Sequence, residues 1–449
     1  MTDARDREIV RLAVPAFLAL VAEPLFLLAD AAIVGHLGVA QLAGLGIAAV
    51  VLQTAVGLCV FLAYGTTASV ARHLGAGDLR GAIAQGVDGI WLAVAIGSVV
   101  TVLGVVLAGP LTHLFGASPE VTDPATTYLR IAFLGTVPLL VMLAATGVLR
   151  GLQDTRTPLA VAVGGNVVNV GLNLVLVYPV GLGIAGSALG SVLAQLVSAA
   201  VFVLVVVRAA RRHGAPLRPD VPGVRAAGRA GVPLVVRTLT LRAGLLVTTY
   251  AVTLAATGPR QQAVDLATHQ LAMSLWTFLA FVLDAIAIAA QAITGRSLGA
   301  GDVAGTRELT ARMIRWGVVS GVVTGALLAV TSPVLGGLFT DDAAVQDLLV
   351  PVLLVAALAQ PVAGVVFVLD GVLIGAGDGR YLAKAGVVTL VAYVPVVLAC
   401  AARSAGLVAI WVAFCAVFMG ARLLVLLHRE RGDAWLVTGV VTAAPRVTP

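Results

Sequence analysis

Residues 12–34 read LAVPAFLALVAEPLFLLADAAIV, an apolar run with two ionisable side chains, Glu23 and Asp30. A helix of about 20 mainly apolar residues crosses the ~30 Å hydrocarbon core of a bilayer, so this run predicts a membrane-spanning helix. Pro24 removes a backbone donor near its middle, and we expect a bend there. Glu23 and Asp30 are two helical turns apart and share a face of this span.

The composition of the whole chain agrees with a membrane protein. Of its 449 residues, 60% are hydrophobic and 11% are charged, whereas roughly 25% of residues are charged in a soluble domain. Such a chain has too few polar side chains to cover a water-soluble globule. The composition therefore excludes two or three soluble domains and predicts an integral membrane protein.

Eleven further apolar runs follow, and together they predict an all-α polytopic fold with twelve transmembrane helices. The expected spans are 8–34, 40–72, 84–109, 124–148, 156–180, 182–208, 231–256, 264–294, 309–335, 345–375, 380–400 and 403–428.

The basic residues predict the orientation of these spans. Of the 28 Arg and Lys residues, 23 fall in alternate gaps on one side, Arg446 near the chain end among them. Arg130, Arg260 and Arg403 fall on the other side, and two more arginines lie inside the seventh span. This asymmetry places both termini in the cytoplasm. It also explains the net charge of +6 without a nucleic-acid partner.

An internal repeat divides the chain into two halves. The sequence LGAGD occurs at 74–78 and again at 298–302, an offset of 224 that other short matches share. Six spans per copy give both copies the same orientation, so we expect two six-helix bundles related by a pseudo-twofold axis along the membrane normal. The predicted domains are an N-terminal bundle (1–210), a cytoplasmic linker (211–230) and a C-terminal bundle (231–449).

Four ionisable side chains are expected near the bilayer midplane. Glu23, Arg242, Asp284 and Asp370 lie between about 15 and 20 Å from the nearest cytoplasmic arginine at 1.5 Å per residue, and Asp30 lies in the outer part of the first span. Charges at this depth are costly and therefore indicate function. The alternatives are a structural ion pair between Arg242 and Asp284, a helix-capping role for Asp370 and, for Asp30, contact with the outer water without a role in transport.

The fifth span contributes Asn166, Asn169 and Asn173, spaced three and four residues apart on one helix face. We expect them to line a cavity in the N-terminal half, although ordinary hydrogen bonding between helices is an alternative. Removal from water disfavours the charged form of a carboxylate, so an acid beside this stripe can exchange a proton. An organic cation can occupy the same place only after the proton has left, which is the physical basis of an antiporter.

Two sequences that look catalytic are not expected to be so. Residues 181–186 fit G-x-G-x-x-G, but no soluble strand precedes them. Residues 295–299 fit G-x-S-x-G, but they end a membrane helix, and the other copy of the repeat has Ala71–Gly75 there. We therefore predict no enzyme activity, no cofactor and no metal site.

Several segments resemble the multidrug and toxic compound extrusion (MATE) family, most closely its DinF-like branch. They are Asp30–Gly38 (DAAIVGHLG), the two LGAGD turns, Leu149–Leu159 (LRGLQDTRTPL) and Leu369–Asp378 (LDGVLIGAGD). The resemblance spans both halves. It implies a V-shaped pair of six-helix bundles that exports organic cations or similar drugs in exchange for H⁺ or Na⁺.

The resemblance also implies roles for single residues. Asp30 matches the first-helix aspartate that takes the coupling proton in this branch, and Asn169 matches an asparagine of its hydrogen-bond network. Asp370 falls at the acidic position of the tenth helix, and Asp284 resembles the aspartate of the eighth. Many relatives have an aspartate where this chain has Asn173, which argues against a two-carboxylate cation site in this half.

The predicted function is a multidrug efflux antiporter of the cell (plasma or inner) membrane, coupled to H⁺ in preference to Na⁺. We expect Asp30, Glu23, Asp284 and Asp370 to couple the ion, a hinge at Pro24, and a substrate cavity lined by Asn166, Asn169, Asn173 and Arg242. We also expect a monomer, with a small organic cation, the coupling ion and lipid as its partners. The rivals are a lipid-linked oligosaccharide flippase of the same superfamily and a non-transporting receptor or scaffold. One arginine against several acids in the cavity favours a cation.

Overall fold

A computed structural model describes residues 4–440, and it contains helices and no strands within that range. Arg446, one of the arginines behind the topology prediction, lies outside the described residues. Over this range eleven helical segments are long and apolar enough to cross a membrane. A bent pair, α5 (Pro119–Leu134) and α6 (Thr136–Gly151), makes a twelfth span. The prediction of an all-α protein with twelve spans is confirmed.

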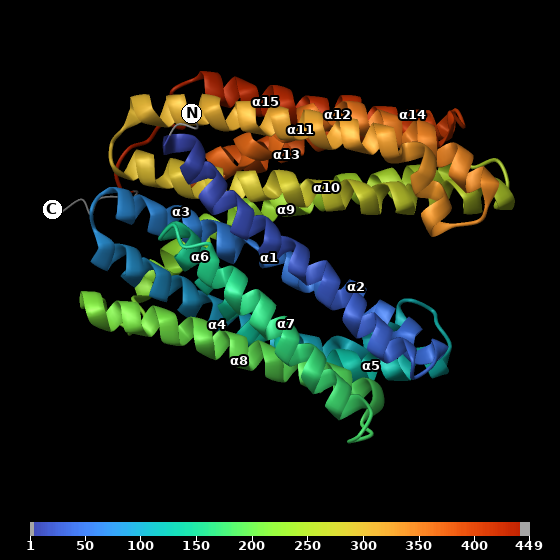
Figure 1. The fold of residues 1–449 in the computed structure, drawn as a ribbon, viewed down its shortest axis with the longest axis horizontal. Helices are drawn as coiled ribbons and strands as arrows, with labels where there is room; N and C mark the ends of the chain where they lie inside the picture. Colours follow the sequence, from blue (N-terminus) through green and yellow to red (C-terminus); the bar gives the residue numbers. More distant parts are fainter. Residues whose placement is uncertain (1–3, 441–449) are drawn as a thin grey trace. The chain divides into compact units, whose positions relative to one another are not determined.

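The chain divides into two compact units, and the first contains residues 14–231 with 299–301 and, of the described chain end, 439–440. In this unit α7 packs along α8 and α4 packs along α6 (Figure 1). Besides α5 and α6, its helices are α1 (Ala4–Gly35) from Val14 onward, α2 (Val39–Leu58), α3 (Phe61–Gly75), α4 (Leu79–His113), α7 (Arg156–Val177), α8 (Gly183–His213) and the beginning of α9 (Val221–Ala255).

The second unit contains residues 232–298 and 302–438, together with the first turns of α1 up to Ala13. In this unit α11 and α12 run side by side (Figure 1). Its helices are α9 from Val232, α10 (Pro259–Gly299), α11 (Val303–Phe339), α12 (Ala343–Gly375), α13 (Gly379–Ala402), α14 (Gly406–Ala413), the π-helical turn η1 (Phe414–Phe418) and α15 (Met419–Arg431).

The repeat found in the sequence is also present in the backbone. Gly77 and Gly301, which are 224 residues apart, have φ angles of +78° and +77°. A residue with a side chain rarely adopts this conformation, so glycine is needed in both turns. The aspartates that follow, Asp78 and Asp302, each accept a backbone N–H bond of 2.8 Å from the residue three positions later. Each therefore caps the next helix in the same way.

Glycines allow α11 and α12 to pack with their backbones in contact. Gly317, Gly321 and Gly325 are spaced four residues apart and lie on one face of α11. A Cβ atom on Gly317 would lie 2.5 Å from the carbonyl oxygen of Gly364 in α12. Lipid offers no hydrophobic drive for two apolar helices to associate, so close packing of this kind stabilises the pair.

The span formed by α5 and α6 is bent by 50° at Gly135. Pro138 has no N–H with which to bond the carbonyl of Leu134, so the ladder of helical hydrogen bonds is interrupted here. The neighbouring carbonyl of Phe133 instead accepts a 3.0 Å bond from the Thr101 hydroxyl of α4. The bend therefore has a local cause, and a neighbouring helix satisfies part of the freed backbone.

Part of the stretch predicted as a linker, 211–230, is helical in the structure. Helix α8 continues to His213 and α9 already begins at Val221, so 214–220 is the non-helical part. The prediction counted hydropathy, which marks where apolar residues begin and not where a helix does. Asp220 starts α9 early because its carboxylate accepts the N–H of Gly223 at 3.0 Å. The units divide after Gly231.

Candidate functional site

Asp30 is a buried carboxylate near the end of α1 in the first unit, with 3% of its surface exposed. Its Oδ2 accepts a 3.1 Å hydrogen bond from the hydroxyl of Tyr128 in α5. Its Oδ1 accepts a 3.0 Å bond from Asn173 Nδ2 in α7 and another from the hydroxyl of Ser187 in α8. Three helices thus supply donors to one acid, as a buried charge requires.

The predicted asparagine stripe contributes two of its three members to this network. Asn173 Nδ2 also donates to Asn169 Oδ1 at 2.9 Å, and Asn169 Nδ2 donates to Ser191 Oγ at 3.0 Å. Asn166 makes a separate contact, in which its Nδ2 donates to the carbonyl of Ala22 at 3.0 Å. That carbonyl lies two residues before Pro24, so Asn166 holds the segment of α1 where a hinge is predicted.

Small residues on α8 bring α7 close enough for these bonds. A Cβ atom on Gly190 would lie 2.0 Å from Asn173 Oδ1, and one on Gly186 would lie 2.7 Å from the carbonyl of Leu176. The two glycines are four residues apart, which places them on one face of the helix. Asn173 can lie between α7 and α8 because position 190 has no side chain.

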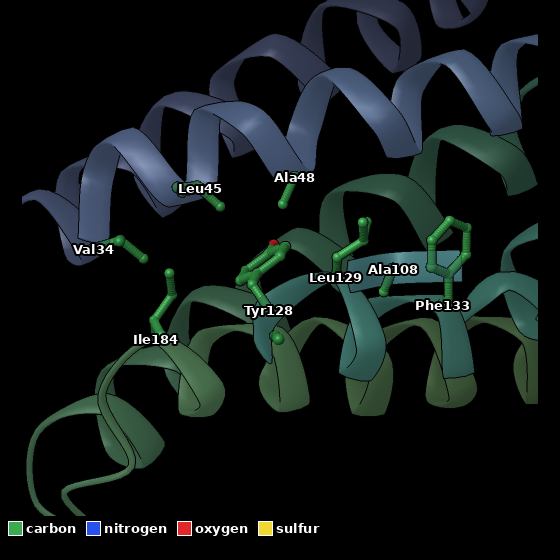
Figure 2. Packing of buried hydrophobic residues seen from close by; sticks show 9 residues of the cluster. Val34, Leu45, Ala48, Ala108, Tyr128, Leu129, Phe133 and Ile184 are labelled. Atoms are coloured by element: carbon green, nitrogen blue, oxygen red, sulfur yellow. The ribbon is translucent and has the colours of Figure 1, made fainter. Parts of the chain in front are cut away.

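Tyr128 joins the polar network to the apolar core of the same unit. Its ring packs in a cluster with side chains of α1, α2, α4, α5 and α8, among them Val34, Leu45, Ala48 and Ile184 (Figure 2). The ring is 6% exposed, and its hydroxyl reaches Asp30. Packing therefore fixes the position of one donor to the carboxylate.

The network contains partners for both protonation states of Asp30. A carboxylate accepts the three donors described above, whereas a protonated acid also needs an acceptor for its own hydrogen. The hydroxyls of Tyr128 and Ser187 can turn to accept it. Within residues 4–440, Asn173 Oδ1 is buried and has no hydrogen-bond partner, so it is a further acceptor beside Asp30.

Glu23 lies apart from this network. Its side chain is exposed, and among the described residues it makes no hydrogen bond or ion pair. Helix α1 continues without interruption through Pro24. The structure therefore does not bring Glu23 together with Asp30, and the hinge at Pro24 stays a prediction.

Asp370 of α12 belongs to an ionic cluster in the second unit. Arg237 of α9 donates from Nε to Oδ1 at 3.1 Å and from Nη2 to Oδ2, and Arg422 of α15 donates from Nη2 to Oδ2 at 3.2 Å. The Asp370 side chain is 8% exposed. Asp370 is thus held by two guanidinium groups and lies five residues before the end of α12.

Two arginines that the sequence did not assign to the cavity, Arg237 and Arg422, lie beside Asp370. The placement of Arg242 in the substrate cavity stays a prediction. Arg242 is exposed. Asp284 is half-buried on α10. Hydropathy gives the position of a residue along its helix but not the rotation of the helix about its axis.

Sequence reasoning missed five residues of the two clusters: Tyr128, Ser187, Ser191, Arg237 and Arg422. Arginine inside an apolar span is rare, so the position of Arg422 within 403–428 was an available signal. Arg237 was recognised as lying within a span but was given no partner. Serine and tyrosine are common in membrane helices and carry no such signal.

Comparisons with known proteins agree with one another. The MatE family model matches residues 15–175 and 242–399. Protein DETOXIFICATION 44, chloroplastic, of Arabidopsis thaliana is 33% identical, covering 93% of this chain and 80% of its own. DNA damage-inducible protein F of Escherichia coli K12 is 27% identical over 83% of this chain and 81% of its own. A MOP superfamily transporter from Pyrococcus furiosus has the same fold, with a TM-score of 0.85 at 21% identity over 97% of both chains.

Proposed function

Because the chain belongs to the MatE family of multidrug and toxic compound extrusion transporters, we propose that it is a proton-coupled antiporter that exports organic cations or similar amphipathic compounds. The family model covers most of the chain and both halves of the repeat. The protein is a multi-pass membrane transporter, and members of its family are transporters and not enzymes. The coupling ion and the class of substrate are the parts that we propose.

The observation that carries this proposal is the environment of Asp30. It is a buried acid in a membrane-spanning helix, and its partners are neutral donors from three other helices. No cation balances it among the described residues. A buried charge without an opposite charge is costly, so binding a cation or a proton there is favourable.

Competition for this acid couples the two fluxes. A proton on Asp30 neutralises the site and removes the attraction for a cationic drug, and the drug in turn excludes the proton. Alternating access then exposes the site to one side of the membrane at a time. In this proposal Asn169 and Asn173 hold the Asp30 carboxylate in position, and Asn166 holds α1 near Pro24. A bend of α1 at Pro24, which Glu23 modulates, transmits the movement along that helix.

The same geometry favours H⁺ over Na⁺. A metal cation requires several oxygen ligands with free lone pairs. Around Asp30, Asn173 Oδ1 is the one side-chain oxygen that is buried without a hydrogen-bond partner among the described residues, and the other groups donate N–H and O–H bonds to the carboxylate. Asn173 stands where many relatives have a second acid, so the site has one carboxylate to offer. One acid with neutral partners is suited to holding one proton.

The second unit has a different role in this proposal from the one the sequence suggested. Asp370 is paired with Arg237 and Arg422, so coupling through Asp370 requires that these pairs first open. Asp284 stays a candidate for the coupling path and Arg242 for the substrate cavity. We therefore assign the primary proton site to Asp30 and a secondary role in ion coupling to Asp284 and Asp370 of the second unit.

The rival functions lose support. Membership of the MatE family argues against a scaffold or receptor, and the names of the relatives point to detoxification and not to a flippase for lipid-linked sugars. The proposed location is the cell membrane, with both termini in the cytoplasm, as the distribution of arginines indicates. A monomer contains both units and is the proposed active form.

The test is transport by purified protein in liposomes. With an imposed pH gradient, a cationic dye such as ethidium should move in exchange for protons, and a sodium gradient of the same size should not drive it. Collapsing the pH gradient with a protonophore should stop dye movement. Equal dye flux with all ion gradients collapsed would refute the antiport mechanism, and flux driven only by sodium would refute the choice of ion.

A further inference from the structure

A small cavity in the second unit lies beside the ionic cluster. About 20 Å³ of it is open to the centre of a water-sized sphere, and α9, α12, α13 and α15 line it. Its charged lining residues are Arg237, Asp370 and Arg422, and Thr389 is among the others. On this measure a cavity needs at least about 10–15 Å³ to hold one water molecule, so this one has room for a small ion and not for a drug-sized ligand.

Within this cavity Arg422 has donors left over. A guanidinium group carries five N–H donors, and in the described residues Arg422 uses one of them, to Asp370 Oδ2 at 3.2 Å. Its side chain is 11% exposed. A cation so far removed from water is costly to leave poorly solvated. Arg422 is therefore prepared to bind an acceptor inside the cavity.

Asp370 does not satisfy that need alone. Arg237 contacts both of its carboxylate oxygens, and Arg422 shares only Oδ2. Two guanidinium groups thus meet one carboxylate at the edge of the cavity. The Asp370 carboxylate accepts bonds from both arginines. This pairing reduces the electrostatic repulsion between the carboxylate and an incoming anion.

Thr389 provides a second, independent indication of a ligand. Its side chain is fully buried, and among the described residues its hydroxyl has no hydrogen-bond partner. Leaving a buried hydroxyl unpaired costs about 1–3 kcal/mol. Because Thr389 lines the same cavity as Arg422, an acceptor placed there can satisfy both donors.

We propose that Arg422 and Thr389 form a binding site for a small monovalent anion, either a halide or the carboxylate of a small acid. The anion accepts charge-assisted bonds from Arg422 and a bond from the Thr389 hydroxyl. It gives Arg422 a second acceptor besides Asp370 Oδ2 and stabilises the second unit. The repeat confines the site to this unit, because the residues 224 positions before Arg422 and Thr389 are Ser198 and Gly165.

The test is binding of chloride to the purified full-length protein in detergent. The thermal unfolding midpoint is measured as chloride replaces gluconate at constant ionic strength. We expect a saturable rise for the wild type, because a ligand of the folded state stabilises it. Acetate in place of chloride identifies the source of the negative charge: a rise with acetate indicates a carboxylate site, and a rise with chloride alone indicates a halide site.

Three variants locate the effect. Arg422→Gln should weaken chloride binding by about tenfold or more, and Thr389→Val should weaken it by about threefold to tenfold. Thr310→Val is the control, since Thr310 is a buried threonine whose hydroxyl is already paired with Thr306 at 2.8 Å, and its chloride dependence should equal that of the wild type. Thr389→Val is nearly isosteric, so it decides the matter if Arg422→Gln does not fold. No saturable rise in the wild type, or an unchanged chloride affinity in Thr389→Val, would overturn the proposal.

Discussion

Gly190 is the residue on which the geometry around Asp30 most depends. A Cβ atom there would lie 2.0 Å from Asn173 Oδ1, so Gly190→Ala must displace Asn173 and break its bonds to Asp30 and Asn169. We expect loss of coupled transport and a stability cost of about 1–3 kcal/mol, the usual range for overpacking. Dye flux in liposomes and thermal unfolding measure the two effects.

Gly171→Ala is the matched control for this change. Gly171 lies on α7, the helix that carries Asn173, and its Cβ would have no neighbour within 4 Å. The control should transport normally. Normal coupling in Gly190→Ala would show that the contact between Asn173 and Asp30 is not required.

The residue at position 173 decides whether the site around Asp30 contains one carboxylate or two. Asn173→Asp replaces an amide by an acid of the same shape and restores the residue that many relatives have. The variant loses the Nδ2 donor and places two acids side by side, which cannot both stay charged at low cost. We expect the number of protons exchanged per drug to rise from about one towards two. The reversal potential of drug flux in liposomes measures this ratio, and an unchanged ratio contradicts the one-acid account.

For single residues, the sequence indicated some of the hydrogen-bond partners of Asp30 and missed others. The acid and the asparagines stood out because polar groups are rare in apolar spans, and Asp30, Asn169 and Asn173 do meet. Tyr128 and Ser187 lie 98 and 157 residues from Asp30 along the chain, and no local pattern links them to it. Glu23 was given a shared helix face with Asp30, but the neighbouring helices surround only Asp30.

Among the elements, α11 and α12 bring their backbones into contact at glycines. A Cβ on Gly364 would lie 2.0 Å from the carbonyl oxygen of Gly317, and a backbone atom cannot rotate away as a side chain can. We expect Gly364→Ala to separate the helices and to lower the free energy of unfolding by about 1–3 kcal/mol or more. Thermal unfolding and yield of folded protein measure the loss.

Gly337→Ala serves as the comparison for this helix pair. Gly337 lies on α11 with open space where its Cβ would be, so this variant should unfold as the wild type does. Equal stability of Gly364→Ala and Gly337→Ala would contradict the close approach of α11 to α12.

The start of α12 provides a pH-dependent contact outside the spans. Asp342 caps this helix through the N–H of Ala344 at 3.0 Å and pairs with Arg260 at 2.6 Å. Arg260 first, and then the backbone N–H groups, hold the pKa of Asp342 below its ordinary value of 3.8. A lowered pKa contributes stability above the unfolded value and loses it as the pH falls through the folded one.

We therefore expect Arg260→Gln to lower the unfolding midpoint slightly at pH 7 and at pH 5. The difference from the wild type should shrink below about pH 3.8, where Asp342 takes up a proton in the unfolded chain. The effect is small because the pair is exposed to solvent and is screened. Thermal scans at pH 7, 5 and 3 measure it, and a difference that grows on acidification contradicts the assignment.

Over the whole molecule, the sequence predicted the membrane spans well but did not predict how each helix is rotated about its own axis. The number of spans follows from the thickness of the bilayer, which any apolar run of sufficient length must match. The repeat follows from the LGAGD turns, because a glycine with positive φ is hard to replace. The pairing of Asp370 with Arg237 and Arg422 depends on how each helix is turned, which hydropathy does not record.

These contacts imply that the two units have different functions. The acid of the first unit has neutral partners and is available to a mobile cation. Asp370 in the second unit is paired with two arginines and is therefore not available to a mobile cation. We therefore expect drug and proton to compete in the first unit, while the second responds to small anions.

Proton release on drug binding tests the competition at Asp30 most directly. Calorimetric titration of the purified protein with a cationic drug, repeated in buffers of different ionisation enthalpy, counts the protons released per drug bound. The account predicts about one proton for the wild type near the pH at which transport is half-maximal, and none for Asp30→Asn that is folded in the same detergent. The same number of protons released by both proteins would contradict it.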